Sequence, residues 1–185
     1  AIYRGLDPVR NGIEWCKRAI TPAYPNFRFE CADIRNALYN PEGEISGRGI
    51  RLPFQDGTFD FTAMISVATH LPPDEIEAYC SEVFRVLRPG GRLFLTAFVM
   101  CADDDPSHPD RDARLKAFEK ADGQPCWHLR GENPMAAVGF EDAFLDDALT
   151  TAGFDIHTKS FGAWRGKAAA HYQDFLIARK PRRNA

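Results

Sequence analysis

The sequence lacks a long apolar run, a strong charge of either sign and any Cys-x-x-Cys pair, and each absence argues against a class of protein. The longest apolar run, Phe94 to Ala102, is far shorter than the roughly 20 residues of a membrane-spanning helix. The formal net charge of -3 predicts no nucleic-acid or membrane partner. The five cysteines are an odd number, which favours free thiols in a reducing compartment and so predicts a cytoplasmic protein.

What the sequence does contain is the alternating pattern of an α/β domain. Apolar residues recur at helical spacing in three segments, and short apolar runs between them indicate buried strands. The last two expected strands lack a helix between them, so we expect them to pair antiparallel. The expected strands are 1–6, 27–33, 59–66, 92–100, 154–161 and 172–178, and the expected helices are 8–20, 72–88 and 140–152.

We therefore expect residues 1–185 to form a single α/β domain with a Rossmann-like, doubly wound, mostly parallel sheet and an antiparallel C-terminal strand. Residues 36–50 read as a turn-rich surface loop. Residues 102–139 read as an insert or lid on the acceptor side, with a short helix near 115–121.

Ligands of such sheets bind at the carboxyl ends of the strands. Asp7 ends the first expected strand, where its carboxylate can accept hydrogen bonds from two ribose hydroxyls or simply cap the next helix. Asp33 ends the second strand, where it can accept from an adenine amine or serve as a turn residue. Position alone leaves both pairs of alternatives open.

Several short motifs lie in order along nearly the whole chain, which makes the set more specific than any one of them. The motifs are Gly5-Leu6-Asp7, Cys31-Ala32-Asp33-Ile34, the run from Leu52 to Asp60, the run from Arg85 to Leu93, and Asn133-Pro134 through Phe140. They resemble those of class I S-adenosylmethionine-dependent methyltransferases of the small-molecule branch.

The resemblance implies S-adenosylmethionine as the cofactor, a small molecule as the acceptor, and roles for individual residues. Asp7 would hold the ribose hydroxyls, with Pro8 and Val9 near the adenine. Asp33 and Ile34 would read the adenine edge. Met64, Ile65 and Ser66 would lie near the methionine moiety, and Thr69 and His70 would lie where the acceptor enters.

His70 is the candidate catalytic residue, as a general base for a hydroxyl or amine acceptor, although it can equally cap or pack against the next helix. Trp127 and Arg130 are candidate acceptor-binding residues, against the simpler interpretation of a packed surface segment. We expect no metal site. Possible ligands do cluster at Cys101, Asp103, Asp104, Asp105 and His108, but a solvated loop explains them.

One element of the resemblance has no counterpart: the first strand and the glycine-rich loop that approaches the cofactor. We expect the chain to be an N-terminally truncated piece whose parent is active and which alone is inactive. One alternative is a catalytically silent, methyltransferase-like interaction module. A weaker one is a nicotinamide-dependent dehydrogenase, which the turn at residues 88–91 and the closing strand pair do not fit.

Overall fold

The computed structural model describes residues 1–101 and 118–182. Within it the chain forms two compact units, residues 1–50 and residues 51–185. Each unit has its own sheet, so the N-terminal and C-terminal units are described separately. The expectation of one domain over the whole chain stays a prediction.

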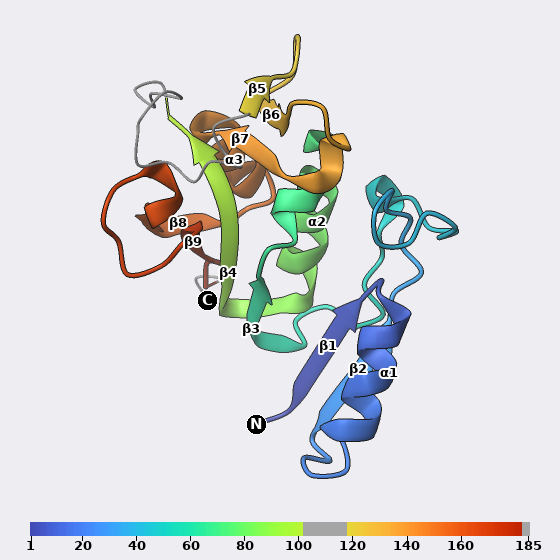
Figure 1. The fold of residues 1–185 in the computed structure, drawn as a ribbon. Helices are drawn as coiled ribbons and strands as arrows, with labels where there is room; N and C mark the ends of the chain where they lie inside the picture. Colours follow the sequence, from blue (N-terminus) through green and yellow to red (C-terminus); the bar gives the residue numbers. More distant parts are fainter. Residues whose placement is uncertain (102–117, 183–185) are drawn as a thin grey trace. The chain divides into compact units, whose positions relative to one another are not determined.

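The N-terminal unit is a β-α-β unit followed by a loop (Figure 1). Strands β1 (Tyr3–Asp7) and β2 (Phe27–Cys31) pair in parallel, and helix α1 (Arg10–Ala19) connects them. Gly5 is required in β1 because a Cβ there would lie 2.7 Å from a ring carbon of Phe29. The loop after β2 contains a short 3-10 helix, η1 (Gly47–Gly49), which agrees with the expected irregular segment.

The C-terminal unit is built around one long strand, β4 (Leu87–Met100). β4 pairs in parallel with β3 (Phe59–Met64) and β7 (Val138–Glu141), and antiparallel with β9 (Asp174–Arg179). β9 pairs antiparallel with β8 (Asp155–Ser160), as expected for the last two strands. The Rossmann-like α/β class is thereby confirmed.

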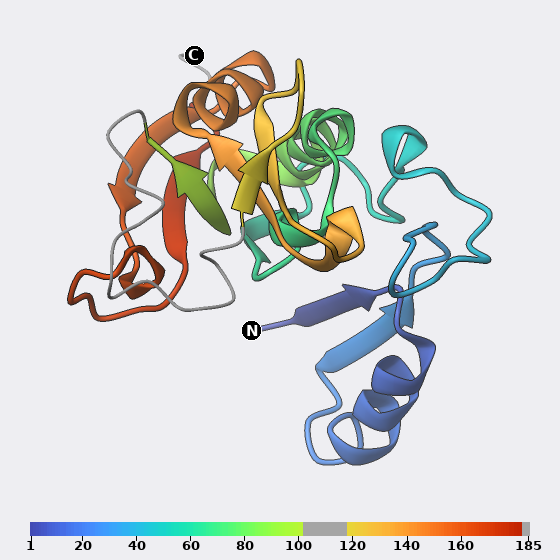
Figure 2. The same ribbon diagram turned by 45° about the horizontal axis from the view of Figure 1, so that its top comes forward.

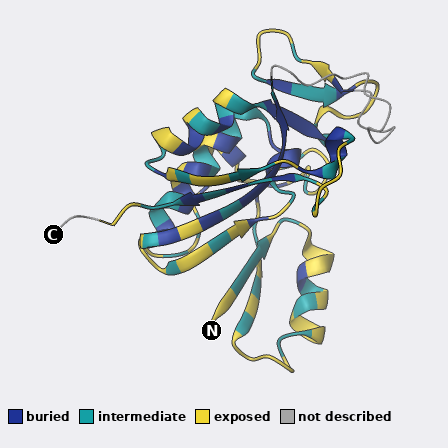
Figure 3. Ribbon diagram, turned by 90° about the vertical axis from the view of Figure 1, so that its left-hand side faces the viewer, coloured by how far each residue is buried: buried dark blue, intermediate teal, exposed yellow. Residues whose placement is uncertain are grey.

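Helices α2 (Pro73–Val86) and α3 (Asp142–Thr151) cover one face of this sheet. The stripe of α2 that buries Ile76, Cys80 and Val83 faces alternate residues of β4, so apolar surface is removed from water on both sides. Figure 3 shows buried residues concentrated along these strands and helices, whereas β1 and β2 are intermediate or exposed throughout. The main core therefore lies in the C-terminal unit.

The expected insert contains strands where we predicted a helix. Its described part holds β5 (Phe118–Lys120), β6 (Cys126–Leu129) and the 3-10 helix η4 (Pro134–Ala136). β5, β6 and β7 run side by side through antiparallel pairing (Figure 2). The prediction of a helix over 118–121 was wrong because these residues pair with β6, and residues 115–117 lie outside the described residues.

Two expected helix boundaries also need correction. Asp7 is not the N-cap of α1: the cap is Val9, and Asp7 Oδ1 instead accepts a hydrogen bond from the Val9 N–H. Pro89-Gly90-Gly91 does not end α2, since the helix stops at Val86 and the chain is already extended at Leu87. The glycines lie within the first residues of β4, where Gly90 takes a φ of 83°.

Two of the recognised motifs are joined by a single arginine. Arg85 of α2 uses all five guanidinium N–H groups: two bind Glu82, two bind the carbonyls of Leu52 and Phe54, and one binds Asp56. Glu82 also accepts from the Leu52 N–H at 2.8 Å. The segment 52–56 is thus held on the end of α2 by hydrogen bonds to its backbone.

Within the described residues, β1 pairs only with β2, and β3 pairs only with β4. Each of these parallel strands therefore has one edge without a neighbouring strand. The expectation that the first strand of the family is missing from this chain stays a prediction.

Candidate functional site

The N-terminal unit brings two of the predicted cofactor residues to one edge of its sheet. β1 and β2 are parallel with Asp7 opposite Cys31, so Asp7 and Asp33 both follow the carboxyl ends of their strands. The Asp7 carboxylate is exposed, and the Val9 N–H holds one of its oxygens at 2.7 Å. Among the described residues its other oxygen has no hydrogen-bond partner, so it remains able to accept from a ligand.

Asp33 is engaged by its own loop. Its carboxylate accepts from the Asn40 side chain at 3.3 Å and from the Glu44 N–H at 3.4 Å, and its carbonyl accepts from Ile45 N–H. Ile34 is buried and bridges to Ile45. These contacts are those of a turn residue. They shape the loop that follows β2.

The three residues predicted near the methionine moiety have different surroundings at the end of β3. Met64 is the last residue of the strand and is buried in the main core. Ile65 is 66% exposed. Ser66 has a φ of 58° and is the only described non-glycine residue with positive φ, a conformation that costs energy for a residue with a Cβ.

The acceptor-side candidates Thr69 and His70 lie on the 3-10 helix η2 (Ala68–His70). Thr69 is 1% exposed, and its hydroxyl donates back to the Ser66 carbonyl at 3.1 Å. His70 is half-buried, and its Nδ1 lies 2.9 Å from the Met135 carbonyl. Because a carbonyl only accepts, Nδ1 carries the proton, so the neutral ring has its lone pair on Nε2.

A second histidine holds the neighbouring carbonyl of the same 3-10 helix. His128 Nδ1 lies 3.1 Å from the Pro134 carbonyl, one residue before the carbonyl that His70 binds. The two histidines therefore bind consecutive carbonyls of η4. This contact fixes η2 against the insert within the C-terminal unit.

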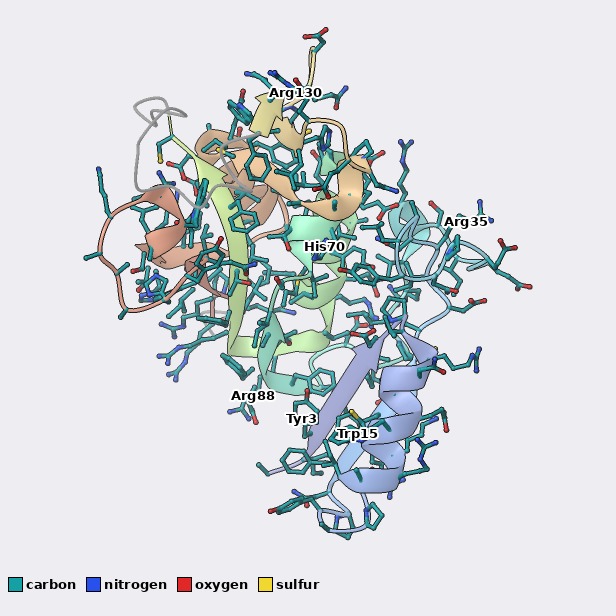
Figure 4. The ribbon with its side chains drawn as sticks, in the orientation of Figure 1. Tyr3, Trp15, Arg35, His70, Arg88 and Arg130 are labelled. Atoms are coloured by element: carbon teal, nitrogen blue, oxygen red, sulfur yellow. The ribbon has the colours of Figure 1, made fainter. Side chains whose placement is uncertain are left out.

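Trp127 and Arg130 each contact residues other than His70. Trp127 packs against the small second core around Phe98 and carries the Lys120 ammonium over its ring at 5.0 Å. The Arg130 guanidinium binds Glu119 at 2.8 Å and is largely exposed. Figure 4 shows Arg130 and His70 apart on the same unit. Binding of the acceptor by these residues stays a prediction.

In the described part of the chain no group of three metal-ligating side chains is found. Cys101, the first member of the cluster weighed in the sequence, lies 3.6 Å from the Arg165 guanidinium. Asp103, Asp104, Asp105 and His108 lie outside the described residues. None of the described helices is long and apolar enough to cross a membrane.

Two residues beside Ser66 were missed by the sequence interpretation. Thr96 of β4 accepts the Ser66 N–H at 2.8 Å, and Gln173, which precedes β9, donates to the Ser66 hydroxyl at 2.7 Å. One signal was present: Thr96 is a polar residue inside the longest apolar run of the chain. Nothing in the sequence pattern distinguishes Gln173, because its role depends on strand pairing across 107 residues.

The parallel strand pairs, with polar groups at the carboxyl ends of β1 and β2 in one unit and of β3 in the other, are those of a Rossmann-like α/β protein. A model of the methyltransferase domain matches residues 1–95, more than half of the 185-residue chain. The chain belongs to this methyltransferase domain family. The match includes Asp7, Asp33, Ser66 and His70.

Named relatives are methyltransferases too. The chain is 31% identical over 124 residues to a sterol 24-C-methyltransferase of Yarrowia lipolytica, covering 65% of this chain and 32% of that relative. It is 35% identical over 100 residues to methyltransferase phqN of Penicillium fellutanum, covering 53% of this chain and 30% of that relative. The chain therefore spans about a third of the length of the curated relatives it matches.

Solved structures share the fold at lower identity. A SAM-dependent methyltransferase of Methanosarcina mazei superposes with a TM-score of 0.62 at 21% identity, over 97% of this chain and 82% of that one. The 1,6-didemethyltoxoflavin-N1-methyltransferase of Burkholderia thailandensis, solved with bound 1,6-didemethyltoxoflavin and S-adenosylhomocysteine, gives 0.55 at 16% identity, over 96% of this chain and 60% of that one.

Proposed function

We propose that the whole protein transfers a methyl group from S-adenosylmethionine to a small-molecule acceptor. The family match over residues 1–95 supports the reaction class, and the names of the relatives support a small molecule. The single observation that carries the proposal is the Asp7 carboxylate at the end of β1, inside the matched region. The acceptor itself stays open, because the insert lies beyond the matched residues.

The residues of the N-terminal unit fit the adenosine part of this cofactor. Asp7 supplies an exposed carboxylate, and a carboxylate can accept hydrogen bonds from two neighbouring ribose hydroxyls. Val9 is exposed beside it, so its apolar side chain is available to a purine ring, whereas Ile34 is buried and can contribute only its backbone. S-adenosylmethionine, when bound, supplies a methyl group on a positively charged sulfur.

His70 is suited to remove the acceptor's proton. Its Nδ1 donates to the Met135 carbonyl, which holds the ring and puts the lone pair of the neutral form on Nε2. We propose that Nε2 takes the proton of a hydroxyl or amine during methyl transfer. If the acceptor has no proton that must leave during methylation, positioning alone is sufficient.

The decisive experiment measures S-adenosylhomocysteine binding to the whole protein by calorimetry, with Asp7→Asn as the test variant and Glu30→Gln as its control. Both changes remove one carboxylate from an exposed position of the same unit. Hydrogen bonds to a charged group contribute about 1.5–3 kcal/mol each, so Asp7→Asn is expected to lower affinity at least tenfold. Equal affinities in wild type and Asp7→Asn would contradict the assignment.

His70→Asn tests the proposed base, because the asparagine amide can still donate to the Met135 carbonyl while the imidazole nitrogen that would accept the proton is lost. We expect kcat to fall by about 100-fold, with S-adenosylhomocysteine affinity unchanged. A kcat close to wild type assigns His70 to fixing η4 only.

We also propose that the whole protein supplies a further strand and a glycine-rich loop for this cofactor. The support is that β1 and β3 are parallel strands, each with an edge that no described strand pairs. Residues 1–185 alone are then expected to bind S-adenosylhomocysteine at least tenfold more weakly than the whole protein. The five free cysteines agree with a cytoplasmic location, which we propose on that basis.

A further inference from the structure

The backbone at Ser66 is held in a conformation that its own side chain disfavours. The φ of 58° lies in the left-handed region, which glycine adopts freely and serine does not. Such a conformation persists only where surrounding contacts enforce it, and it is common at ligand sites. Three side chains supply those contacts: Thr69, Thr96 and Gln173.

The hydrogen bonds around Ser66 form a ring with a defined direction. Thr96 Oγ1 accepts the Ser66 N–H at 2.8 Å, so its own hydrogen goes to Gln173 Oε1 at 2.6 Å. The amide nitrogen of Gln173 then donates to Ser66 Oγ at 2.7 Å. The Thr96 hydroxyl thus accepts one hydrogen bond and donates another. The Gln173 side chain likewise accepts through its amide oxygen and donates through its amide nitrogen.

Within this ring Ser66 Oγ only accepts, from Gln173, so the hydrogen of the Ser66 hydroxyl is directed to a group outside the ring. The nearest described acceptor is Thr69 Oγ1 at 3.4 Å, whereas good O–H···O bonds are shorter than about 3.0 Å. The hydrogen of Thr69 is itself directed at the Ser66 carbonyl. Ser66 therefore keeps a hydroxyl donor with only a weak partner within the protein.

The same ring fixes the peptide group between Ile65 and Ser66. A trans peptide is planar with its N–H and C=O opposed, so an N–H directed at Thr96 turns the Ile65 carbonyl the opposite way. Directly after β3 the chain thus carries an oriented carbonyl acceptor beside an oriented hydroxyl donor. The ammonium of an amino-acid group can donate to such a carbonyl, and its carboxylate can accept from such a hydroxyl.

We propose that Thr96 and Gln173 are positioning residues that orient the Ile65–Ser66 segment toward the amino-acid end of the cofactor. The inference rests on the proposed function and extends it to two residues outside the recognised motifs. Neither residue touches the reacting atoms: each acts through Ser66. The ring then matters for one end of the ligand and not for the adenosine.

The test compares two ligands on the whole protein, by titration well below the thermal midpoint of each variant. S-adenosylhomocysteine has the amino-acid end, and 5′-methylthioadenosine lacks it. Thr96→Val and Gln173→Met remove the ring from opposite sides, and Thr96→Ser restores the hydroxyl. Thr62→Val is the matched control, because the Thr62 hydroxyl on β3 is buried with no partner among the described residues.

We expect Thr96→Val and Gln173→Met to weaken S-adenosylhomocysteine at least tenfold and 5′-methylthioadenosine less than twofold. Thr96→Ser and Thr62→Val should bind both ligands as wild type does. Unchanged S-adenosylhomocysteine affinity, or equal loss for both ligands, overturns the positioning role while leaving the proposed function intact. A wild-type protein that binds neither ligand overturns both. Gln173→Met decides the matter if Thr96→Val does not fold.

Discussion

Replacing Arg85 by methionine removes five hydrogen bonds while keeping an unbranched side chain of similar length on α2. The carboxylate of Glu82 loses a bidentate partner at 2.9 and 2.8 Å, and the carbonyls of Leu52 and Phe54 lose their donors. The segment from residue 52 to residue 56, which leads toward β3, then loses the three hydrogen bonds that Arg85 donates to it and keeps the one from the Leu52 N–H to Glu82.

The expected loss follows from the exposure of the partners. The side chains of Arg85 and Glu82 are 13% and 11% exposed, so their pair behaves largely as a buried one. Breaking such a pair costs about 3–5 kcal/mol. Arg51 remains on Glu82, and Asp56 is 76% exposed and contributes little, so we place the loss near 3 kcal/mol. For a chain of this size that corresponds to about 6–12 °C in thermal midpoint.

Urea and thermal unfolding of the variant measure this loss, and Arg88→Met is the control. Arg88 follows the same helix and pairs with Asp60 at 2.6 Å, but the two side chains are 62% and 71% exposed. Exposed pairs contribute about 0–1 kcal/mol. If Arg85→Met costs no more than Arg88→Met, the argument that Arg85 anchors the 52–56 segment is refuted.

Three further predictions concern pH, packing and thiol chemistry. The Arg85 hydrogen bond lowers the pKa of Glu82 in the folded protein below its ordinary value of 4.5. The stability that the pair contributes is therefore present above pH 4.5 and is lost as the pH falls through the lower folded value. The unfolding free energy of Arg85→Met should accordingly fall less steeply with acid than that of the wild type. Gly162→Ala should cost more than about 2 kcal/mol by unfolding, since its Cβ would lie 2.0 Å from the Tyr172 carbonyl oxygen, whereas Gly49→Ala meets nothing within 4 Å and should cost little. Burial raises the pKa of the Cys80 thiol to about 12, so a thiol reagent should label Cys16 and Cys31 in the folded protein and Cys80 only on unfolding; fast labelling of Cys80 without unfolding contradicts its burial.

Most elements were predictable because their signals are local. The stripe of α2 and the apolar run of β4 are visible as periodicity and composition, and both were found. The strand β5 was not, since three residues become a strand only when a partner, β6, lies alongside them. The end of α2 was misplaced because the extended conformation at Leu87 comes from pairing with β3 rather than from the glycines after it.

The candidate site also has one part that the sequence could predict and another that only the structure shows. Asp7, Asp33, Ser66 and His70 were chosen as candidates because each lies at or shortly after the end of an expected strand. In the structure they make different contacts: Asp33 is held by its own loop, and His70 donates to a carbonyl of the insert. The partner of His70 could not be predicted from sequence spacing, since Met135 is 65 positions away.

The sequence by itself determined the class of this protein, the order of its main strands and helices, and the carboxylate at the end of β1. These depend on neighbouring residues and on short motifs. Only the tertiary structure decided that Ser66 is held in a left-handed conformation by Thr96 and Gln173, and that Arg85 joins two motifs. Such contacts depend on which strands and helices become neighbours, and hydrogen bonds formed across 30 and 107 positions leave no period in the sequence.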